Sequence, residues 1–281
     1  MPFEVLQKRQ LSEAVFEMTV AAPAVAAKVR PGQFLMLRVD EHGERIPLTF
    51  SDWDAEQGWV RFIFMVVGKT THALSHREAG ETIADLVGPL GKPTRVEGLG
   101  RCVVVGGGVG AAVAYPVARA MAEAGNEVTV ILGARTADLL VLADEFEKLP
   151  ISELIVATDD GSEGRKGLVT EPLKELCDAG VVDHAMAIGP AIMMKFCAAT
   201  TRPYGVPTVV SLNPIMVDGT GMCGACRVSV GGETKFGCVD GPDFDGHLVD
   251  FEELMSRQRI YADEEREADA AYRQECSCRT K

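Results

Sequence analysis

The sequence predicts a β-barrel domain, then an α/β domain with a five-stranded parallel sheet, a small cysteine-rich loop domain and a helical tail. Three observations predict this order. Short alternating apolar runs with frequent turn signals fill residues 1–97, apolar strands alternate with helical segments after them, and three cysteines follow in a Gly-rich loop. The expected boundaries are 1–97, 98–213, 214–246 and 247–281.

The barrel is predicted from the runs at 34–39 and 60–67, which are separated from their neighbours by turn signals such as Pro31-Gly32 and Gly88-Pro89. Many short strands with frequent turns are typical of barrels. One helix is expected in this domain, at about 70–77.

The α/β domain is predicted from five apolar strands at 102–105, 128–132, 154–157, 185–188 and 208–212. Continuous apolar strands with helices between them indicate a parallel sheet covered on both faces. The sheet is expected to end at Asn213-Pro214, where the cysteine loop begins, and a hairpin is expected at Gly231-Gly232.

A glycine-rich turn follows the first of these strands. Gly106-x-Gly108-x-x-Ala111 fits the dinucleotide fingerprint, in which the backbone approaches a pyrophosphate at a helix N-terminus. The Rossmann pattern also expects an acid about 20 residues later. Because the sequence has Gly133-Ala-Arg135 there, the strict Rossmann interpretation fails. Arg135 suits a 2′-phosphate, and a surface arginine after a strand is the ordinary alternative.

Two further loops follow strands. Asp159-Asp160-Gly161 carries acids that suit ribose hydroxyls and repel a 2′-phosphate, and an ordinary polar turn is the alternative. Gly189-Pro190 opens a helix, and residues 191–194 are expected near any ligand at this edge of the sheet. The preferred interpretation of Met193 and Met194 is that they are core residues.

In the barrel, residues 45–51 combine an arginine with two hydroxyl side chains on a strand that Pro47 stiffens. A guanidinium binds phosphate oxygens in a bidentate way. Residues 68–71 open the one expected helix, which is a second candidate phosphate site.

The cysteine loop has the spacing Asp218-x4-Cys223-x2-Cys226-x11-Cys238. Plant-type [2Fe–2S] proteins use C-x4-C-x2-C with a distant fourth cysteine. Here an aspartate takes the first position, and the preferred interpretation makes Asp218 the fourth ligand. A zinc site ranks second, and a dithiol redox pair or three inert buried thiols remain as alternatives.

Composition and charge limit the partners and the cellular location that we expect for this protein. A net charge of −13 argues against nucleic acid or an anionic membrane as partner. Cys102, Cys177 and Cys197 are scattered through apolar segments and are expected to be core residues. The N-terminal residues have no signal-peptide pattern, and no apolar run approaches the ~20 residues of a membrane span, so a reducing cytoplasm is expected.

The C-terminal tail, from about residue 251, is expected to be helical and charged, with a weak apolar stripe formed by Phe251, Leu254, Met255 and Tyr261. Packing on its own chain and docking to a partner subunit are equal alternatives. Cys276 and Cys278 are interpreted as two exposed thiols on a frayed end.

In this order, the motifs resemble the ferredoxin–NADP reductase superfamily. Within it, they resemble the electron-transfer subunits of dihydroorotate dehydrogenase, whose clusters have four cysteines. Because of Asp218 they are most similar to the small subunits of the electron-bifurcating NADH-dependent reduced ferredoxin:NADP oxidoreductases. The resemblance implies an enzyme subunit in which NAD(H) exchanges hydride with FAD, and FAD exchanges single electrons with a [2Fe–2S] cluster. It implies no catalytic acid or base.

The resemblance also implies site residues. FAD is expected at Arg45, Pro47, Leu48, Thr49, Ser51, Met65 and Val67, with Thr49 or Ser51 near the reactive flavin edge and Gly68, Lys69, Thr70 and Thr71 at the pyrophosphate. NAD(H) is expected at Gly108, Val109, Gly110, Ala111, Arg135, Asp159, Asp160, Gly161, Gly189 and Pro190, and the cluster at Asp218, Cys223, Cys226 and Cys238. NAD is expected over NADP because of the acidic loop, and Arg135, Arg165 and Lys166 are the opposing charges.

The implied partner is a larger iron–sulfur flavoprotein that binds NADP and ferredoxin. The alternatives are the electron-transfer subunit of a dihydroorotate dehydrogenase or of a sulfide dehydrogenase, and a non-catalytic zinc-binding module on the same fold.

Overall fold

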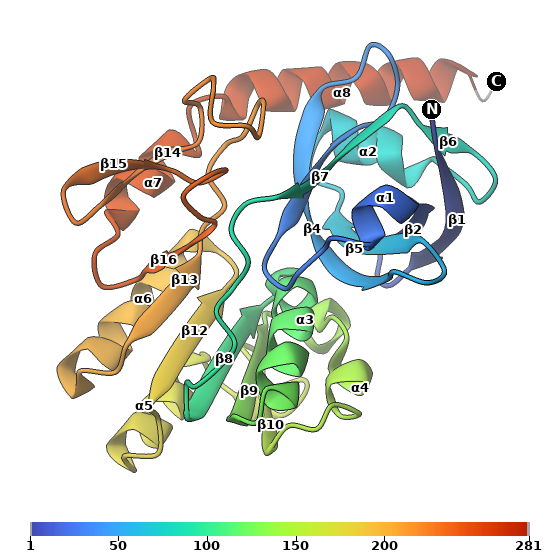
Figure 1. Cartoon of the computed structure of the whole chain (residues 1–281). Coiled ribbons are helices and arrows are strands. Elements are labelled where there is room, and N and C mark those ends of the chain that lie inside the picture. The colour runs from blue at the N-terminus through green and yellow to red at the C-terminus, as the bar shows by residue number, and fades with distance from the viewer. Residues whose placement is uncertain (1, 280–281) are drawn as a thin grey trace.

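The structure is a computed structural model that describes residues 2–279, with side chains described as far as Gln274. The expectation for Cys276 and Cys278 therefore falls outside the described side chains. Figure 1 shows the barrel above the α/β domain, with the cysteine-containing segment at one side of both.

The N-terminal domain is a seven-stranded antiparallel sheet in the order β6-β1-β2-β5-β4-β3-β7. Its strands are β1 (Phe3–Gln10), β2 (Val15–Ala21), β3 (Phe34–Arg38), β4 (Arg45–Asp54), β5 (Trp59–Met65), β6 (Thr82–Ile83) and β7 (Asp85–Leu90). Only Ala84 separates β6 from β7, so the chain itself joins the two ends of the order. The sheet therefore curls into the predicted barrel, which is nearly closed.

The barrel interior is filled by apolar side chains from alternate strand positions, among them Val20, Leu35, Phe62 and Phe64. Two helices, α1 (Pro23–Ala26) and α2 (Lys69–Ser75), lie in the connections. Helix α2 confirms the helix that was expected near 70–77, whereas the sequence analysis did not predict the short helix α1.

The second domain is a seven-stranded sheet in the order β11-β10-β9-β8-β12-β13-β16. The strands are β8 (Arg101–Gly107), β9 (Glu127–Ala134), β10 (Glu153–Thr158), β11 (Arg165–Lys166), β12 (His184–Ile188), β13 (Thr208–Ser211) and β16 (Asp243–Asp245). The five predicted strands are confirmed as parallel neighbours. The sequence did not reveal the short strands β11 and β16, and β16 pairs with β13 in the antiparallel direction.

Helices cover both faces of this sheet (Figure 1). They are α3 (Gly110–Glu123), α4 (Ala143–Phe146), α5 (Thr170–Asp178) and α6 (Ala191–Thr201), with short 3₁₀ turns at Ala137–Leu139 and Arg202–Tyr204. Successive residues of β8 point to opposite faces. Val103 and Val105 pack with α5 and α6, whereas Cys102 and Val104 pack with α3.

The predicted Gly-Gly hairpin is confirmed: β14 (Arg227–Val230) and β15 (Glu233–Phe236) are joined by Gly231 and Gly232, both with positive φ. The three scattered cysteines Cys102, Cys177 and Cys197 are buried, as expected. The predicted fold class is therefore confirmed, while the domain boundaries remain predictions.

The tail forms α7 (Phe251–Arg257) and α8 (Ala262–Arg279). Phe251 and Leu254 are buried against the α/β domain, whereas Tyr261 is exposed. Helix α8 lies along the barrel beside α2 (Figure 1), where His72 Nδ1 is 3.3 Å from Asp269 Oδ1. The tail therefore packs on its own chain.

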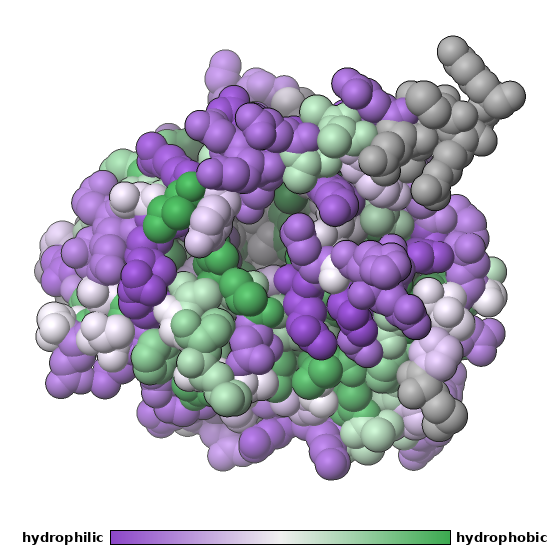
Figure 2. Space-filling view, turned by 90° about the horizontal axis from the view of Figure 1, so that it is seen from above, coloured by the Kyte–Doolittle hydropathy of each residue, from purple (hydrophilic) through white to green (hydrophobic). Residues whose placement is uncertain are grey.

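Within the described residues, no helix combines the length and the apolar character that crossing a membrane requires. Seen from above in Figure 2, hydrophilic side chains cover most of the face and hydrophobic ones appear in patches between them.

Candidate functional site

A cleft of about 1170 Å³ lies between the barrel and the carboxyl ends of the parallel strands. In open α/β sheets, ligands bind at this edge where the strand order reverses, here between β8 and β12. Thirteen of the predicted cofactor residues line it: Pro47, Leu48, Thr49, Met65, Val67, Thr71, Gly108, Val109, Gly110, Arg135, Asp159, Gly189 and Pro190.

The other eight predicted residues do not line the cleft: Arg45, Ser51, Gly68, Lys69, Thr70, Ala111, Asp160 and Gly161. Several of them have other contacts. Arg45 lies 3.6 Å from Asp85, and Ala111 is buried where its backbone packs against Gly106. Close packing of helix on strand is the role of the third position in the glycine fingerprint.

Strand β4 forms the barrel wall of the cleft. Pro47, Leu48 and Thr49 are half-buried and line it, whereas Ser51 is buried. The register slips between Phe50 and Asp52, so Ser51 occupies a β-bulge. Its hydroxyl has no hydrogen-bond partner. Of the two hydroxyl residues expected near the flavin edge, Thr49 is the one at the cleft.

The start of α2 forms the rim of the barrel wall. Thr71 Oγ1 accepts hydrogen bonds from the amides of Val67 at 3.0 Å and Gly68 at 3.2 Å. This side chain closes the turn that begins the helix. Val67 and Thr71 face the cleft.

The glycine turn after β8 forms the floor. A Cβ on Gly110 would lie 2.4 Å from the Ile188 carbonyl oxygen, so only glycine lets α3 approach β12 this closely. A Cβ on Gly108 would meet nothing within 4 Å, and its φ is +53°. Gly108 therefore presents bare backbone to the open cleft.

The loops after β9 and β10 bring Arg135 and Asp159 to the cleft. Asp160 instead accepts hydrogen bonds from the hydroxyl of Ser162 at 2.6 Å and from its amide at 2.9 Å, which lower the pKa of Asp160. Arg165 pairs with Glu175 at 2.7 Å. Of the charged residues considered for nucleotide specificity, Arg135 and Asp159 are the two at the cleft.

Helix α6 forms part of the cleft wall. Met194 is buried as expected, whereas Met193 both packs against the core and lines the cleft. Ile192, from the segment expected near a ligand, also lines the cleft, and so does Phe196, which the sequence analysis missed; both are about half exposed. The segment Ser211–Pro214 was missed as well, although its place after the fifth strand puts it at the same sheet edge.

The cysteine loop brings two of its predicted ligands together. Cys226 Sγ lies 3.2 Å from Cys238 Sγ, and both residues are buried, while Cys223 is exposed. Burial, with the hydrogen bond and charge of Cys226, raises the pKa of Cys238 to about 12. Within the described part of the chain, no three His, Cys, Asp or Glu side chains lie close enough together to hold a metal ion.

Asp218 lies apart from the cysteine pair, and its Oδ2 accepts hydrogen bonds from the hydroxyl and the amide of Thr220. These bonds lower the pKa of Asp218, and the charge of Arg45 lowers it further. Asp218 is therefore an anion at neutral pH.

The cysteine pair and the cleft share a wall. Cys226 and Cys238 pack with Phe34, Met36 and Met216 in one apolar cluster. Phe34 and Met216 also line the cleft. The cysteine loop therefore lies directly behind one side of the cleft.

Fold and site together define an oxidoreductase with the ferredoxin–NADP reductase fold. Residues 104–199 match the oxidoreductase NAD-binding domain, and residues 213–250 match the iron–sulfur cluster binding domain of dihydroorotate dehydrogenase B. A ferredoxin NADP⁺ reductase from Neisseria gonorrhoeae has the same fold at 14% identity, with a TM-score of 0.60 over 73% of this chain and 91% of that chain.

Closer relatives define the family. The dihydroorotate dehydrogenase B (NAD⁺) electron transfer subunit homolog of Thermotoga maritima is 52% identical over 94% of this chain and 93% of the relative. The corresponding subunit of Geobacillus thermodenitrificans is 34% identical over 85% and 94%. The chain belongs to this family of electron-transfer subunits.

A solved structure described under flavin-based electron bifurcation by the NADH-dependent reduced ferredoxin–NADP oxidoreductase matches with a TM-score of 0.91. It is 50% identical and covers 95% of this chain and 96% of that chain. These relationships confirm the predicted resemblance and the predicted class of NAD-dependent flavin and iron–sulfur oxidoreductase. They favour the iron–sulfur interpretation of the cysteine loop over zinc and over a dithiol pair.

Proposed function

We propose that this chain is the electron-transfer subunit of an NADH-dependent ferredoxin:NADP⁺ oxidoreductase. In this function it passes electrons between NAD(H), FAD and a [2Fe–2S] cluster, to or from a larger partner subunit. The observation that carries the proposal is the shared wall of the cleft and the cysteine loop, formed by Phe34 and Met216.

The α/β side of the cleft fits a dinucleotide. Gly108 offers open backbone at the start of α3, where a helix N-terminus stabilises a pyrophosphate. Asp159 suits the ribose hydroxyls, and Met193 with Pro190 forms an apolar surface at the end of β12. We infer a preference for NAD over NADP because the Asp159 carboxylate at the cleft repels a 2′-phosphate and Arg165 is paired with Glu175, which leaves Arg135 as the opposing charge at the cleft.

The barrel side fits a flavin. Pro47, Leu48 and Met65 form an apolar wall, and Thr49 supplies a hydroxyl at the cleft. Val67 and Thr71 extend the same wall to the start of α2, where Gly68, Lys69 and Thr70 are candidates for the pyrophosphate. The Ser51 hydroxyl lies next to this wall and is buried without a hydrogen-bond partner. A bound ligand or a water molecule is needed to form that hydrogen bond. When bound, FAD accepts two electrons as hydride and releases them singly.

The cysteine loop fits a cluster in part. Cys226 and Cys238 already lie side by side, and we infer that Cys223 and Asp218 complete the set when the Gly-rich segment 219–224 folds around the metal. Cluster binding then has to release the Cys238 proton, since metal ligands bind as thiolates. The [2Fe–2S] cluster, when bound, transfers one electron at a time.

We infer a larger partner subunit because the relatives are named as electron-transfer subunits. We infer that it binds NADP and ferredoxin, and that the complex works in a reducing cytoplasm, where buried free thiols such as Cys102 and Cys197 stay reduced. The second candidate function is the electron-transfer subunit of a dihydroorotate dehydrogenase, which the names of several relatives favour.

The test is anaerobic co-purification of the native complex followed by spectroscopy and assay. We expect FAD, iron and acid-labile sulfide in the preparation, flavin bleaching by NADH, and NADP⁺ reduction that requires both NADH and reduced ferredoxin. Orotate formation from dihydroorotate would identify the second candidate instead. A colourless, zinc-containing preparation would reject both.

A further inference from the structure

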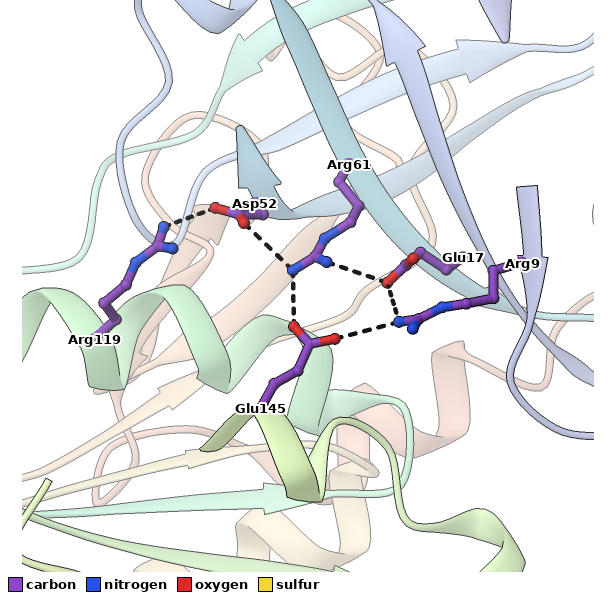
Figure 3. A network of polar contacts seen from close by, with 6 residues as sticks. All are labelled: Arg9, Glu17, Asp52, Arg61, Arg119 and Glu145. Carbon is purple, nitrogen blue, oxygen red and sulfur yellow. Dashed lines mark hydrogen bonds and ion pairs between the residues drawn. The ribbon is translucent and has the colours of Figure 1, made fainter. Parts of the chain in front are cut away.

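A network of charged side chains joins the barrel to the NAD-binding domain (Figure 3). It contains three arginines and three carboxylates, and none of them lines the cleft. Four come from the barrel strands β1, β2, β4 and β5 and two from the helices α3 and α4: Arg9, Glu17, Asp52, Arg61, Arg119 and Glu145.

Arg61 is the centre of this network. Its guanidinium lies 3.3 Å from Glu17, 3.4 Å from Asp52 and 3.2 Å from Glu145. The side chain is only 14% exposed, and that of Glu17 only 7%. Solvent and salt screen such half-buried charges less than surface ion pairs.

The network crosses the domain boundary at two separate points. Arg119 of α3 donates to Asp52 Oδ1 at 2.8 Å, and Glu145 of α4 accepts from Arg61 and Arg9, each at 3.2 Å. Because the two points lie on different helices, together they resist rotation as well as sliding of one domain on the other.

Further contacts stabilise the first crossing point, where Arg119 meets Asp52. The Arg119 guanidinium lies 5.8 Å from the Trp53 ring of the barrel and 5.5 Å from the Tyr115 ring of its own helix. Burial alone lowers the pKa of Arg119, but the hydrogen bond and charge of Asp52 outweigh burial, so the pKa is raised.

Two local distortions of the backbone help to place the carboxylates of the network. The bulge at Ser51 shifts the register of β4 so that Asp52 lies opposite Arg61. Leu142 precedes α4 with φ +61°, the one non-glycine residue with positive φ in the described chain. Such strain persists where the surroundings require it. Here it directs α4, and with it Glu145, towards the barrel.

Strand β5 connects the network to the cleft. Arg61, Ile63 and Met65 alternate along the strand and so share one of its faces. Arg61 belongs to the network, Ile63 packs in the apolar cluster of α3 and also lines the cleft, and Met65 lines the cleft. The network lies about 13 Å along the strand from the cleft wall formed by Met65.

We propose that this network is an orientation lock, in which Arg61, Arg119 and Glu145 are positioning residues that fix the angle between the flavin-binding and nicotinamide-binding walls of the cleft. Ion pairs of this burial add little net stability compared with apolar side chains, but they specify one geometry. Hydride transfer is sensitive to that geometry, since small displacements of reacting groups change rates greatly. The inference rests on the proposed function for its kinetic readout.

The kinetic test uses the intact complex with FAD bound and measures flavin reduction by NADH in a stopped-flow instrument. For Glu145→Gln and Arg119→Gln, we expect the limiting rate constant to fall between about tenfold and a hundredfold. The apparent Kd for NADH and the FAD content should stay near wild type. The isotope effect with NADH deuterated at the transferred hydrogen should rise, because hydride transfer becomes more fully rate-limiting.

The matched control is Glu147→Gln, which removes the same charge from an exposed position two residues beyond Glu145. Arg119→Lys keeps the cation at the other crossing point and should recover part of the rate. A wild-type limiting rate and isotope effect in Glu145→Gln and Arg119→Gln would overturn the proposal. So would a rate loss explained entirely by lost FAD.

A second measurement tests the orientation lock independently of enzymatic activity. Amide hydrogen exchange in the intact complex should accelerate in β5 and α3 for Glu145→Gln but not for Glu147→Gln. Unchanged exchange in β5 and α3 of both variants would overturn the proposal of an orientation lock. If wild-type flavin is not reduced by NADH at all, the proposed function fails, and the exchange data still decide the lock separately.

Discussion

Cys226 Sγ and Cys238 Sγ lie 3.2 Å apart although the two residues are 12 positions apart in the sequence. The β14–β15 hairpin places them side by side, because Cys226 precedes the first strand and Cys238 follows the second. The hairpin thus preorganises half of the expected cluster site. The other half, Asp218 and Cys223, lies on the Gly-rich segment.

The first prediction concerns the carboxylate ligand. Asp218→Cys should keep a [2Fe–2S] cluster and shift its reduction potential, on the order of tens of millivolts. A carboxylate oxygen and a thiolate sulfur donate different electron density to iron, so exchanging one for the other changes the relative stability of the oxidised and reduced cluster. Redox titration followed by electron paramagnetic resonance measures the shift.

Glu233→Cys is the control, since it adds a cysteine at the exposed tip of the same hairpin. It should leave the potential unchanged. An unaltered potential and spectrum in Asp218→Cys would show that Asp218 does not bind the metal.

The second prediction separates two glycines of the same turn. Gly110→Ala should destabilise the protein by about 1–3 kcal/mol, because its Cβ would collide with the backbone of Ile188. Gly108→Ala costs about 1–2 kcal/mol of left-handed strain but meets no protein atom. Its Cβ should instead obstruct the dinucleotide and raise the Kd for NADH about tenfold or more, equivalent to about 1.4 kcal/mol.

Thermal unfolding and NADH titration of both variants test this prediction. Gly180→Ala is the reference for strain alone, since Gly180 has a similar φ of +66° and lies outside the cleft lining. Equal NADH affinity in Gly108→Ala and Gly180→Ala would remove Gly108 from the nucleotide site.

The third prediction concerns Asp243, which joins three segments of the chain. Thr94 Oγ1, between the two large domains, donates to Asp243 Oδ2 at 2.5 Å, and Asp243 pairs with Ser211 across β16 and β13. Its Oδ1 is buried without a partner, and burial raises its pKa to about 6.

The folded state therefore binds this proton more tightly than the unfolded state, whose carboxyl has a pKa of 3.8. Between pH 3.8 and 6, stability should fall as pH rises, and the full cost of the buried charge should be present above pH 6. Asp243→Asn should remove at most about 3 kcal/mol of that cost at pH 7.5 and almost none at pH 4.

Urea denaturation midpoints at several pH values measure the difference between Asp243→Asn and wild type. Asp144→Asn, at an exposed position of α4, is the control for the loss of one carboxylate. A difference for Asp243→Asn that does not grow between pH 4 and 7 would contradict the prediction.

The fourth prediction concerns the tail helix. Asp269 accepts from Arg273 at 2.8 Å and lies 3.3 Å from His72 of α2, whose first turn borders the cleft. Asp269→Ala should cost about 1 kcal/mol and weaken FAD retention, because α2 loses part of its support. Thermal unfolding and FAD content after gel filtration measure both effects. Glu267→Ala, exposed on the same helix, should behave as wild type.

Much of the site was predictable because its signals are local. A strand, a glycine turn and a helix are adjacent in the sequence, so residues 101–111 predicted the floor of the cleft, and the cysteine spacing predicted the metal loop. Phe196 was missed because a helix sequence does not reveal which of its apolar residues faces a ligand cleft rather than the core.

The sequence by itself determined the order of the domains, the five parallel strands and the glycine and cysteine motifs, because each depends on residues close together in the chain. Only the tertiary structure decided that Phe34 and Met216 share a wall, that Asp243 meets Thr94, and that Arg61 meets Glu145. These contacts join residues from 84 to 182 positions apart in separate domains, and the packing of whole domains brings them together. Local patterns of hydropathy and turn residues carry no information about such contacts.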